Sequence, residues 1–193
     1  VVRPDLKRKH DAMGVDQFSF FRATYYRWAQ HFDQLDAAIT GAPEVLSVGD
    51  LHLENFGTWR DRWGRLAWGI NDFDEAYTLP CTNDLIRLAA SVQVVNAEQR
   101  LRIRGASRII LEGYREGLMK GGRPFVIGEE HEWFKPIADH VIRDPRRFWE
   151  KLRGLPKQRT LPDAARSAIA HLLPARDLEL EVRLRVAGLG SLG

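Results

Sequence analysis

Cysteine and long apolar runs are scarce in this sequence. Its 193 residues include one cysteine, Cys81, so the chain cannot form an internal disulfide, as is typical of proteins from a reducing compartment. No apolar run approaches the roughly 18 residues of a membrane-spanning helix, and the N-terminal stretch lacks the apolar segment of a signal peptide. We therefore expect a cytoplasmic protein with no membrane partner. The first residue is Val1 instead of Met, which predicts a processed or trimmed chain.

Lysine is the next scarce residue type, since only six of the 29 basic residues are lysine. The planar guanidinium of arginine binds oxyanions in a bidentate way, so this composition suits phosphate recognition. Alternatively, it reflects a genome rich in G and C, which favours arginine codons. The 26 acidic residues are interspersed among the basic ones, and the net charge is +3. Because no basic arm or stripe results, we expect no nucleic-acid partner. A hydrophobic content of 44% is enough for the core of one domain.

The stretch from Val45 to Ala76 carries the residues best suited to chemistry. Asp50 and Asn55 frame the segment Asp-Leu-His-Leu-Glu-Asn, and Asp72 follows later in the same stretch. Phosphoryl transfer needs one carboxylate to orient a hydroxyl and oxygen ligands to hold Mg²⁺ against phosphates. An Asp, an Asn five residues on and a later Asp supply these groups in the order found in kinases. The pattern predicts Asp50 as the proton acceptor, with Asn55 and Asp72 as Mg²⁺ ligands.

The local structure expected around these residues supports the same site. Residues 45–48 are typical of a short buried strand, and Gly49 then allows a sharp turn. Residues 58–59 and 66–70 are predicted to form two strands around a turn at 61–64. Such a hairpin would bring Asn55 and Asp72 close together at its open end.

Several residues near the site have two interpretations each. His52 either takes part in catalysis or braces the loop as a hydrogen-bonded structural residue. Asp74 is a candidate for a second metal position, and Glu75 is either a helper of that position or a solvated carboxylate. Arg22 is either a clamp for a phosphate or carboxylate or an ordinary surface arginine.

The rest of the chain predicts an α+β protein that is mainly helical. We expect an irregular arm over 1–14 and then helices at about 16–38, 82–95, 98–119, 131–141, 145–152 and 161–173. An aromatic stripe on the first helix is expected to face the core; it comprises Phe18, Phe21, Tyr25, Trp28 and Phe32, with Ala29. Four further aromatic residues are expected to anchor later helices, namely Trp133, Phe134, Phe148 and Trp149. Asp84 either lies in the first helical turn or bonds back to the loop at Asp50.

The C-terminal segment has a different pattern. Residues 178–186 alternate apolar and charged side chains, which predicts a half-exposed strand. A Gly-x-Gly-x-x-Gly sequence follows at 188–193, and it fits either a dinucleotide-binding turn or a kinase glycine loop. An unpaired strand edge favours association, so self-association through this strand is expected unless the strand pairs elsewhere or frays.

Several motifs together resemble a known family. The sequences FSFFRAT, GDLHLENFG, NDFDEA, NDLIRLAAS and GLGSLG resemble the bacterial domain of unknown function 2252, which is grouped with the kinase-like fold. GDLHLEN is also similar to the HGDLHxxN loop of aminoglycoside and choline phosphotransferases, except that Val48 replaces the usual His. The resemblance implies the large lobe of a kinase-like phosphotransferase over 1–175. It also implies a circularly permuted small lobe that begins at 176–193 and is cut off.

The resemblance implies an ATP- and Mg²⁺-dependent phosphotransferase with a small-molecule hydroxyl acceptor. The glycine loop would cover the nucleotide phosphates through Gly188, Gly190, Ser191 and Gly193. No Lys follows that loop on a strand, so the 193 residues alone are expected not to turn over ATP. The alternative is a nucleotide-binding pseudokinase or regulatory protein without turnover. A metallophosphoesterase is disfavoured, because the sequence has no Gly-Asn-His-Asp/Glu element.

Overall fold

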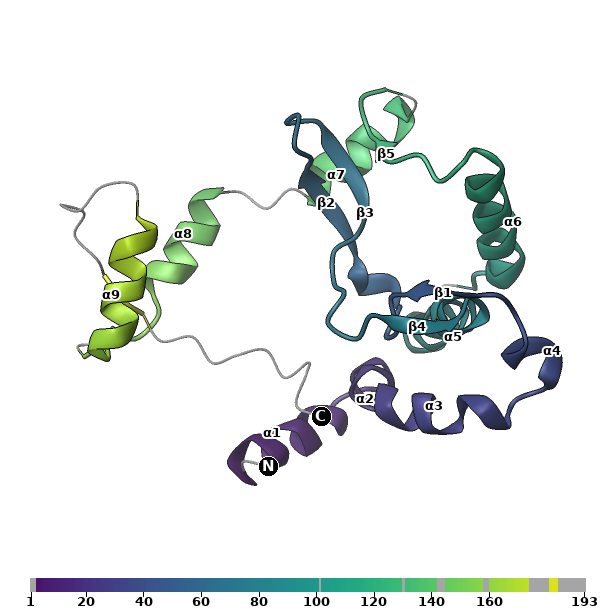
Figure 1. The fold of residues 1–193 in the computed structure, drawn as a ribbon, viewed down its shortest axis with the longest axis horizontal. Coiled ribbons are helices and arrows are strands. Elements are labelled where there is room, and N and C mark those ends of the chain that lie inside the picture. Colours follow the sequence, from purple (N-terminus) through teal and green to yellow (C-terminus); the bar gives the residue numbers. More distant parts are fainter. Residues whose placement is uncertain are drawn as a thin grey trace. The chain divides into compact units, whose positions relative to one another are not determined.

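The computed structural model describes residues 3–100, 102–129, 131–141, 145–157, 160–173 and 181–183. The described residues divide into two compact units, one that ends at residue 138 and another that begins at residue 139. The fold is α+β and mostly helical, as predicted, with two small antiparallel sheets in the first unit (Figure 1).

The N-terminal segment is helical, which corrects the prediction of an irregular arm. Helix α1 covers Arg3–Met13. Pro4 falls in its first turn, where the missing N–H is not needed. The polar composition of this segment concealed a helix, because its Leu, Lys, Arg and Ala residues are good helix formers even without a regular apolar face. Helix α1 packs against the next helix, α2.

The helix predicted over 16–38 is interrupted at Thr24. It forms α2 (Gln17–Ala23), α3 (Tyr25–His31), the 3-10 turn η1 (Phe32–Gln34) and the short α4 (Ala37–Thr40). The Thr24 hydroxyl donates to the Phe20 carbonyl at 2.8 Å, a side-chain bond that competes with regular helix and bends it. Asp16 caps α2 by accepting from the Ser19 N–H at 2.5 Å.

The predicted hairpin is confirmed. Strands β2 (Phe56–Arg60) and β3 (Leu66–Ile70) pair antiparallel, and β5 (Phe125–Val126) adds to β3. The Asp61 carboxylate closes the turn by accepting from the Trp63 and Arg65 N–H groups, both at 2.9 Å. The second sheet joins β1 (Glu44–Ser47) to β4 (Tyr77–Pro80), a strand that the sequence did not predict. A strand was predicted at β1, but its predicted burial was wrong, because Val45 and Leu46 are exposed.

Two long helices follow the sheets. Helix α5 covers Thr82–Gln99 and continues through Asn96, where a break was predicted. The Asn96 amide instead holds the chain beyond the helix, because it accepts from the Ile103 N–H and donates to the Ile103 carbonyl. Helix α6 covers Ala106–Met119 and begins later than predicted, after Gly105 with φ of 70°.

The last helices bury less than expected. They are the 3-10 turn η3 (Glu132–Phe134), α7 (Lys135–Val141), α8 (Pro145–Arg153) and α9 (Asp163–Leu172). Helices α7 and α9 are shorter than predicted, whereas α8 extends one residue beyond its predicted end. Phe134 packs on Trp68 with ring centroids 4.8 Å apart. The other three predicted anchors, Trp133, Phe148 and Trp149, are exposed. For Phe148 and Trp149 the reason is size, since a unit of about 50 residues has little interior in which to bury a ring.

The predicted C-terminal strand lies mostly outside the described residues. Arg183 forms an isolated antiparallel bridge with Lys157, and the Lys157 amine pairs with Glu181 at 2.6 Å. The described part of this segment therefore pairs within the chain. The four glycine-loop positions, Gly188, Gly190, Ser191 and Gly193, lie outside the described residues.

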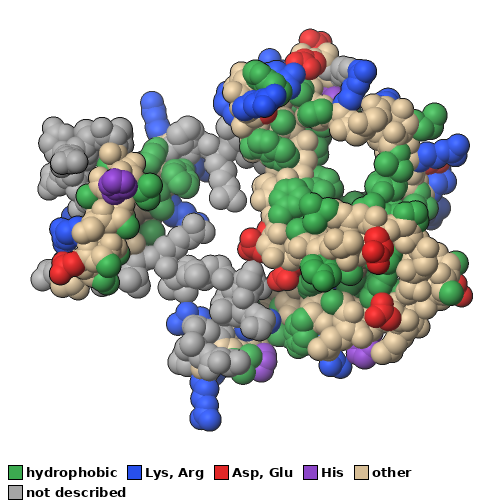
Figure 2. Space-filling model, in the orientation of Figure 1, with side chains coloured by type: hydrophobic (Ala, Val, Ile, Leu, Met, Phe, Trp, Pro, Cys, Tyr) green, Lys and Arg blue, Asp and Glu red, His purple; other side chains and the backbone are tan. Residues whose placement is uncertain are grey.

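The interior around β1 and α5 is unusually polar. Its buried apolar residues include Val48, Leu51 and Val92, and Ser47, His52, Asn55, Asn83, Arg87 and Ser91 are buried beside them. Apolar side chains remain exposed on the β1–β4 sheet, among them Leu46 and Tyr77. Figure 2 shows hydrophobic side chains at the surface of this part of the molecule. Among the described residues, no helix combines the length and hydropathy that crossing a bilayer requires.

Gly49 and Gly64 form a matched pair for testing the packing behind the loop. Both have positive φ, 90° and 79°, but an added Cβ would lie 2.3 Å from the Glu75 carbonyl oxygen at Gly49 and in open space at Gly64. We expect Gly64→Ala to lower the free energy of unfolding by about 1–2 kcal/mol through backbone strain alone. Gly49→Ala should cost at least about 1–3 kcal/mol more, through overpacking. Urea unfolding followed by tryptophan fluorescence measures both. Equal losses would contradict the close packing of Gly49 against Glu75.

Candidate functional site

One face of α5 holds the loop of residues 48–55, which connects β1 to β2 (Figure 1). Four polar residues at helical spacing on α5 bond to this loop, and they are Asn83, Asp84, Arg87 and Ser91. Residues three and four apart in a helix lie above one another, so this spacing makes one continuous polar stripe. The loop is therefore fixed by a helix that follows it in the chain.

Asp84 fixes the start of the loop. Its carboxylate accepts from the Val48 N–H at 2.7 Å and from the Gly49 N–H at 3.0 Å. Both possibilities left open for Asp84 are confirmed, because it lies in the first turn of α5 and also bonds back to the loop. Asn83 supports it, because its amide donates to the Gly49 carbonyl at 3.2 Å and accepts from the Trp28 indole N–H at 2.7 Å.

Arg87 pairs directly with Asp50. Its guanidinium donates to Asp50 Oδ1 and to the Phe21 carbonyl, the latter at 3.3 Å. It also lies 3.8 Å from the centroid of the Phe21 ring, with the rings of Tyr25 and Trp28 at 5.3 and 6.0 Å. Three members of the aromatic stripe that was assigned to the core thus surround a buried cation.

Arg87 is the functional candidate that the sequence analysis missed. Its signal was its position three residues after Asp84, which places both charged residues on one face of the helix. A fully buried arginine requires a paired anion. That rule would have singled out Arg87, but the sequence alone did not reveal its burial.

Burial sets the electrostatics of Asp50. Its side chain is 19% exposed, and desolvation raises the pKa of its carboxyl above the ordinary value. The charges of Arg87 and Arg22 oppose this rise in pKa, and that of Asp72 adds to it. Asp50 therefore lies within electrostatic reach of Asp72, although the two are far apart in sequence.

His52 has the geometry of a brace. It is 1% exposed, its Nδ1 accepts from the Glu54 N–H at 3.2 Å, and its ring meets Phe18 edge-on. Burial, with the nearby charges of Arg22 and Arg87, lowers its pKa to about 3. His52 is therefore neutral at pH 7 with its proton on Nε2, which lies 3.9 Å from Asp50 Oδ2. Since Nδ1 is occupied, this arrangement favours the bracing role over proton acceptance.

Asn55 completes the loop and joins it to the hairpin. Its side-chain oxygen accepts from the His52 N–H at 2.6 Å, and the residue is buried. Its backbone carbonyl accepts from the Asn71 N–H at 2.9 Å. The open end of the hairpin therefore places Asn55 against the residue that precedes Asp72.

The remaining predicted residues are exposed or partly exposed around this loop. Asp72 accepts a long hydrogen bond of 3.4 Å from the Asp74 N–H, and both residues are exposed. Arg22 on α2 pairs with Glu54 at 2.7 Å. Its charge also acts on Asp50 and His52. Arg22, His52, Asn55 and Asp72 thus all act on Asp50 or on the loop that carries it.

Among the residues that the structure describes, no group of three or more His, Cys, Asp or Glu side chains could hold a metal ion. Mg²⁺ at phosphate-binding sites is generally bound by one or two protein oxygens, with phosphate and water completing the shell. Asn55 and Asp72 match that smaller donor set. The Asn55 amide oxygen has a second lone pair besides the one that accepts from His52.

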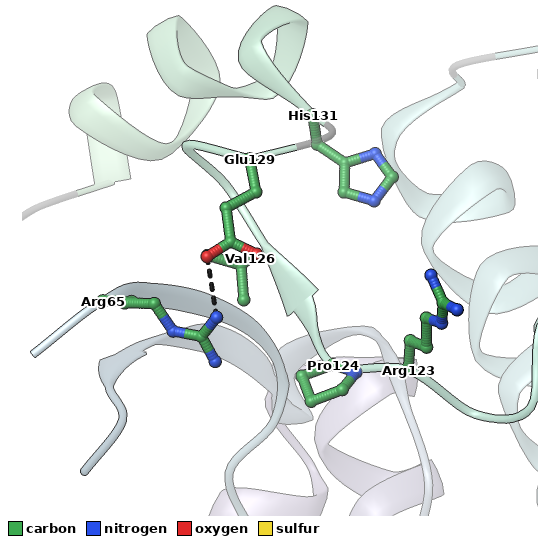
Figure 3. Close-up of a pocket in the computed structure, with 6 residues that line it drawn as sticks. All are labelled: Arg65, Arg123, Pro124, Val126, Glu129 and His131. Atoms are coloured by element: carbon green, nitrogen blue, oxygen red, sulfur yellow. Dashed lines mark hydrogen bonds and ion pairs between the residues drawn. The ribbon is translucent and has the colours of Figure 1, made fainter. Parts of the chain in front are cut away.

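A separate cavity of about 160 Å³ lies beside β5 (Figure 3). It is lined by Arg65, Arg123, Pro124, Val126, Glu129 and His131. Arg65 is already paired with Glu129 at 2.7 Å and with Asp61 at 2.8 Å. Because these two carboxylates offset the charge of Arg65, the cavity is a weaker anion site than its two arginines suggest.

Comparison with known proteins places the chain in a family. The bacterial family DUF2252, described as an uncharacterized protein conserved in bacteria, matches residues 2–124. The chain belongs to this family. The DUF2252 match covers the 48–55 loop, the β2–β3 hairpin and α5, and thus every described residue of the site. No curated protein and no solved structure matches the chain.

The buried His52 predicts a specific dependence of stability on pH. Its pKa is about 3 in the folded protein and 6.5 in the unfolded chain, so the unfolded chain binds more protons between these values. The stability from neutral His52 is complete above pH 6.5 and is lost as the pH falls towards 3, by up to about 1.4 kcal/mol per pH unit. His52→Asn keeps an acceptor for Glu54 but cannot bind this proton. Urea unfolding with a chelator at pH 7, 6 and 5 should therefore show a shallower loss of stability in the variant. Parallel curves would contradict the burial of a neutral imidazole.

Proposed function

We propose that this protein is an ATP- and Mg²⁺-dependent phosphotransferase of the kinase-like class, acting on the hydroxyl group of a small molecule. One observation carries the proposal: Asp50 is a largely buried carboxylate on a loop held by α5, and the end of the same loop, Asn55, bonds to Asn71, the residue before Asp72. Phosphoryl transfer needs one such carboxylate for the acceptor and another for the metal, held in fixed positions. The resemblance of GDLHLEN to the loop of aminoglycoside and choline phosphotransferases supports the small-molecule acceptor.

Asp50 is the proposed proton acceptor. Its Oδ1 is bound by Arg87, so Oδ2 is the oxygen that remains for the acceptor hydroxyl. Burial raises the pKa of the carboxyl above its ordinary value, which makes it a better base than a solvated aspartate. His52 supports this role by fixing the loop between Asp50 and Asn55.

Asn55 and Asp72 are the proposed Mg²⁺ ligands, with Asp74 as the candidate for a second metal position. The metal supplies charge neutralisation of the phosphates and of the leaving oxygen. Asp72 is exposed, and its one described hydrogen bond is long, so its carboxylate can turn towards a cation. Asn55 contributes its side-chain oxygen from a fixed position, because the His52 N–H orients the amide.

Arg22 is the proposed phosphate clamp. Both Arg22 and its partner Glu54 are well exposed, and exposed ion pairs are worth little, so exchange of Glu54 for a phosphate oxygen costs little free energy. The glycine positions Gly188, Gly190, Ser191 and Gly193 are proposed to cover the nucleotide phosphates through backbone N–H groups.

The two carboxylates are expected to separate binding from turnover. In the full-length protein, Asp72→Asn should weaken Mg²⁺-dependent ATP binding, because it removes a negative ligand from a hard cation. Asp50→Asn should leave ATP binding nearly unchanged and reduce phosphate transfer by about 10²–10⁴-fold, the usual contribution of a general base. Calorimetry with ATP, with and without Mg²⁺, measures binding, and a panel of hydroxyl acceptors with labelled ATP measures transfer.

Glu112→Gln on α6 is the matched control, since Glu112 pairs only with the exposed Arg108 among the described contacts. It should leave both quantities unchanged. Equal binding losses in Asp50→Asn and Asp72→Asn would contradict their separate roles. Tight ATP binding without transfer to any acceptor would favour the non-catalytic nucleotide-binding alternative.

A further inference from the structure

A buried cation lies directly against the proposed proton acceptor. The Arg87 side chain is 4% exposed, and Asp50 is its ion-pair partner. Its remaining described contacts are the Phe21 carbonyl and three aromatic rings. The Arg87 Nε is buried with no hydrogen-bond partner among the described residues. The guanidinium is therefore held mainly by Asp50 and by ring faces.

Stability alone does not explain such a pair. Removing two charges from water is costly, and a well-packed apolar pair of the same volume is often as stable or more so. The α2–α3 aromatic residues already provide an apolar surface at this point. A charged Arg87 at this position therefore suggests a role for the pair in the site.

The pair makes the two oxygens of Asp50 inequivalent. Oδ1 is bound by Arg87, while Oδ2 is 3.9 Å from the Nε2 of neutral His52. Rotation of the carboxylate would break the bond to Arg87, and Arg87 cannot follow because Phe21, Tyr25 and Trp28 surround it. The loop is fixed as well, by Asp84 and Ser91 of the same helix.

We propose that Arg87 is a positioning residue that locks the Asp50 carboxylate in one orientation and presents Oδ2 to the acceptor hydroxyl. This inference rests on the proposed function. As the acceptor oxygen bonds to the γ-phosphorus and the bond to ADP breaks, the hydroxyl proton passes to Oδ2, and the electron pair of the broken bond leaves with ADP. Only a carboxylate held in this orientation meets that proton at hydrogen-bond distance.

Arg87 has the further effect of keeping Asp50 ionised. The groups that act on Asp50 come from every neighbouring element: Arg87 from α5, Arg22 from α2, Tyr25 from α3, His52 from the loop and Asp72 from the end of the hairpin. Burial raises the pKa of Asp50, and the charge and hydrogen bond of Arg87 are the largest effects that lower it. Loss of that charge should shift the titration of Asp50 to higher pH.

Arg87→Gln and Arg87→Lys separate the charge of Arg87 from its shape. The first readout is titration of the Asp50 carboxyl carbon by NMR, assigned with Asp50→Asn. The second is kcat and the KM for ATP against pH in the full-length protein. Arg108→Lys, which changes an arginine that is 72% exposed on α6, is the matched control and should change neither readout.

Arg87→Gln should raise the pKa of Asp50 by about one unit or more, the usual effect of losing a close opposite charge. The acid limb of kcat/KM should move with it. Arg87→Lys keeps the charge but loses the planar fork. It should leave the pKa of Asp50 nearly unchanged and lower kcat about tenfold or more, with an unchanged KM for ATP.

Phe21→Leu covers the case in which Arg87→Gln does not fold, because it removes only the ring beneath the guanidinium. It should lower kcat at least about twofold at constant KM, in line with a weak cation–π contact. Wild-type kcat in both Arg87→Lys and Phe21→Leu would overturn the positioning role. An unshifted Asp50 titration in Arg87→Gln would also overturn it. If the Asp50 titration shifts but the wild-type protein transfers no phosphate to any acceptor, the proposed phosphotransferase function is overturned. The interaction of Arg87 with Asp50 is then still supported.

Discussion

Backbone N–H groups at the turn after β1 must be satisfied without a strand partner, and the polar stripe of α5 satisfies them. Val48 and Gly49 donate to Asp84, and Leu53 donates to Ser91. A buried N–H left unpaired costs about 1–3 kcal/mol, and bonds to a charged acceptor are among the stronger ones. Because these bonds run to a helix and not to a sheet, the position of the loop depends on where α5 packs. Asp50 and Asn55 belong to this loop, so their positions also depend on α5. The geometry of the whole candidate site therefore depends on one helix face.

The aromatic stripe of α2 and α3 is the second half of the same arrangement. The interruption at Thr24 leaves Phe21 on α2 and Tyr25 and Trp28 on α3, yet all three rings lie around Arg87. Trp28 also donates to Asn83, so the stripe contacts the polar face of α5 through both hydrogen bonds and ring faces. An aromatic face at helical spacing ordinarily indicates apolar packing. Here, the same face encloses the guanidinium of Arg87. Its partner Asp50 is itself buried enough for desolvation to raise the pKa of the carboxyl.

The hairpin and the loop could be predicted because they depend on local sequence signals. Strand β4 and the burial of Arg87 could not, because they depend on contacts between residues distant in sequence. The β2–β3 hairpin follows from turn chemistry at Asp61 and Gly64, which act within five residues of each other. The bond from Asp84 to the loop was one of the two possibilities that the sequence analysis gave for Asp84. By contrast, β4 exists because β1 pairs with it across some 30 residues, and a strand pairing of that range leaves little local pattern. Arg87 was missed for the same reason, since its burial depends on three rings and a carboxylate that are distant in sequence.

The charged partners of Asp50 and Asp72 differ, and this difference favours separate roles for the two aspartates. Asp50 and Arg87 form a buried ion pair, so the negative charge of Asp50 is already offset by Arg87. Arg22 and Glu54 form a second, exposed pair. Among the described ion pairs none includes Asp72, and its charge makes the ionisation of Asp50 harder. A cation bound at Asp72 would offset that charge and would also lower the pKa of Asp50, so that metal binding and the ionised state of the proton acceptor would favour each other. This coupling follows from the arrangement of charges alone, and it explains why the proposed metal ligand and the proposed base belong on adjoining elements.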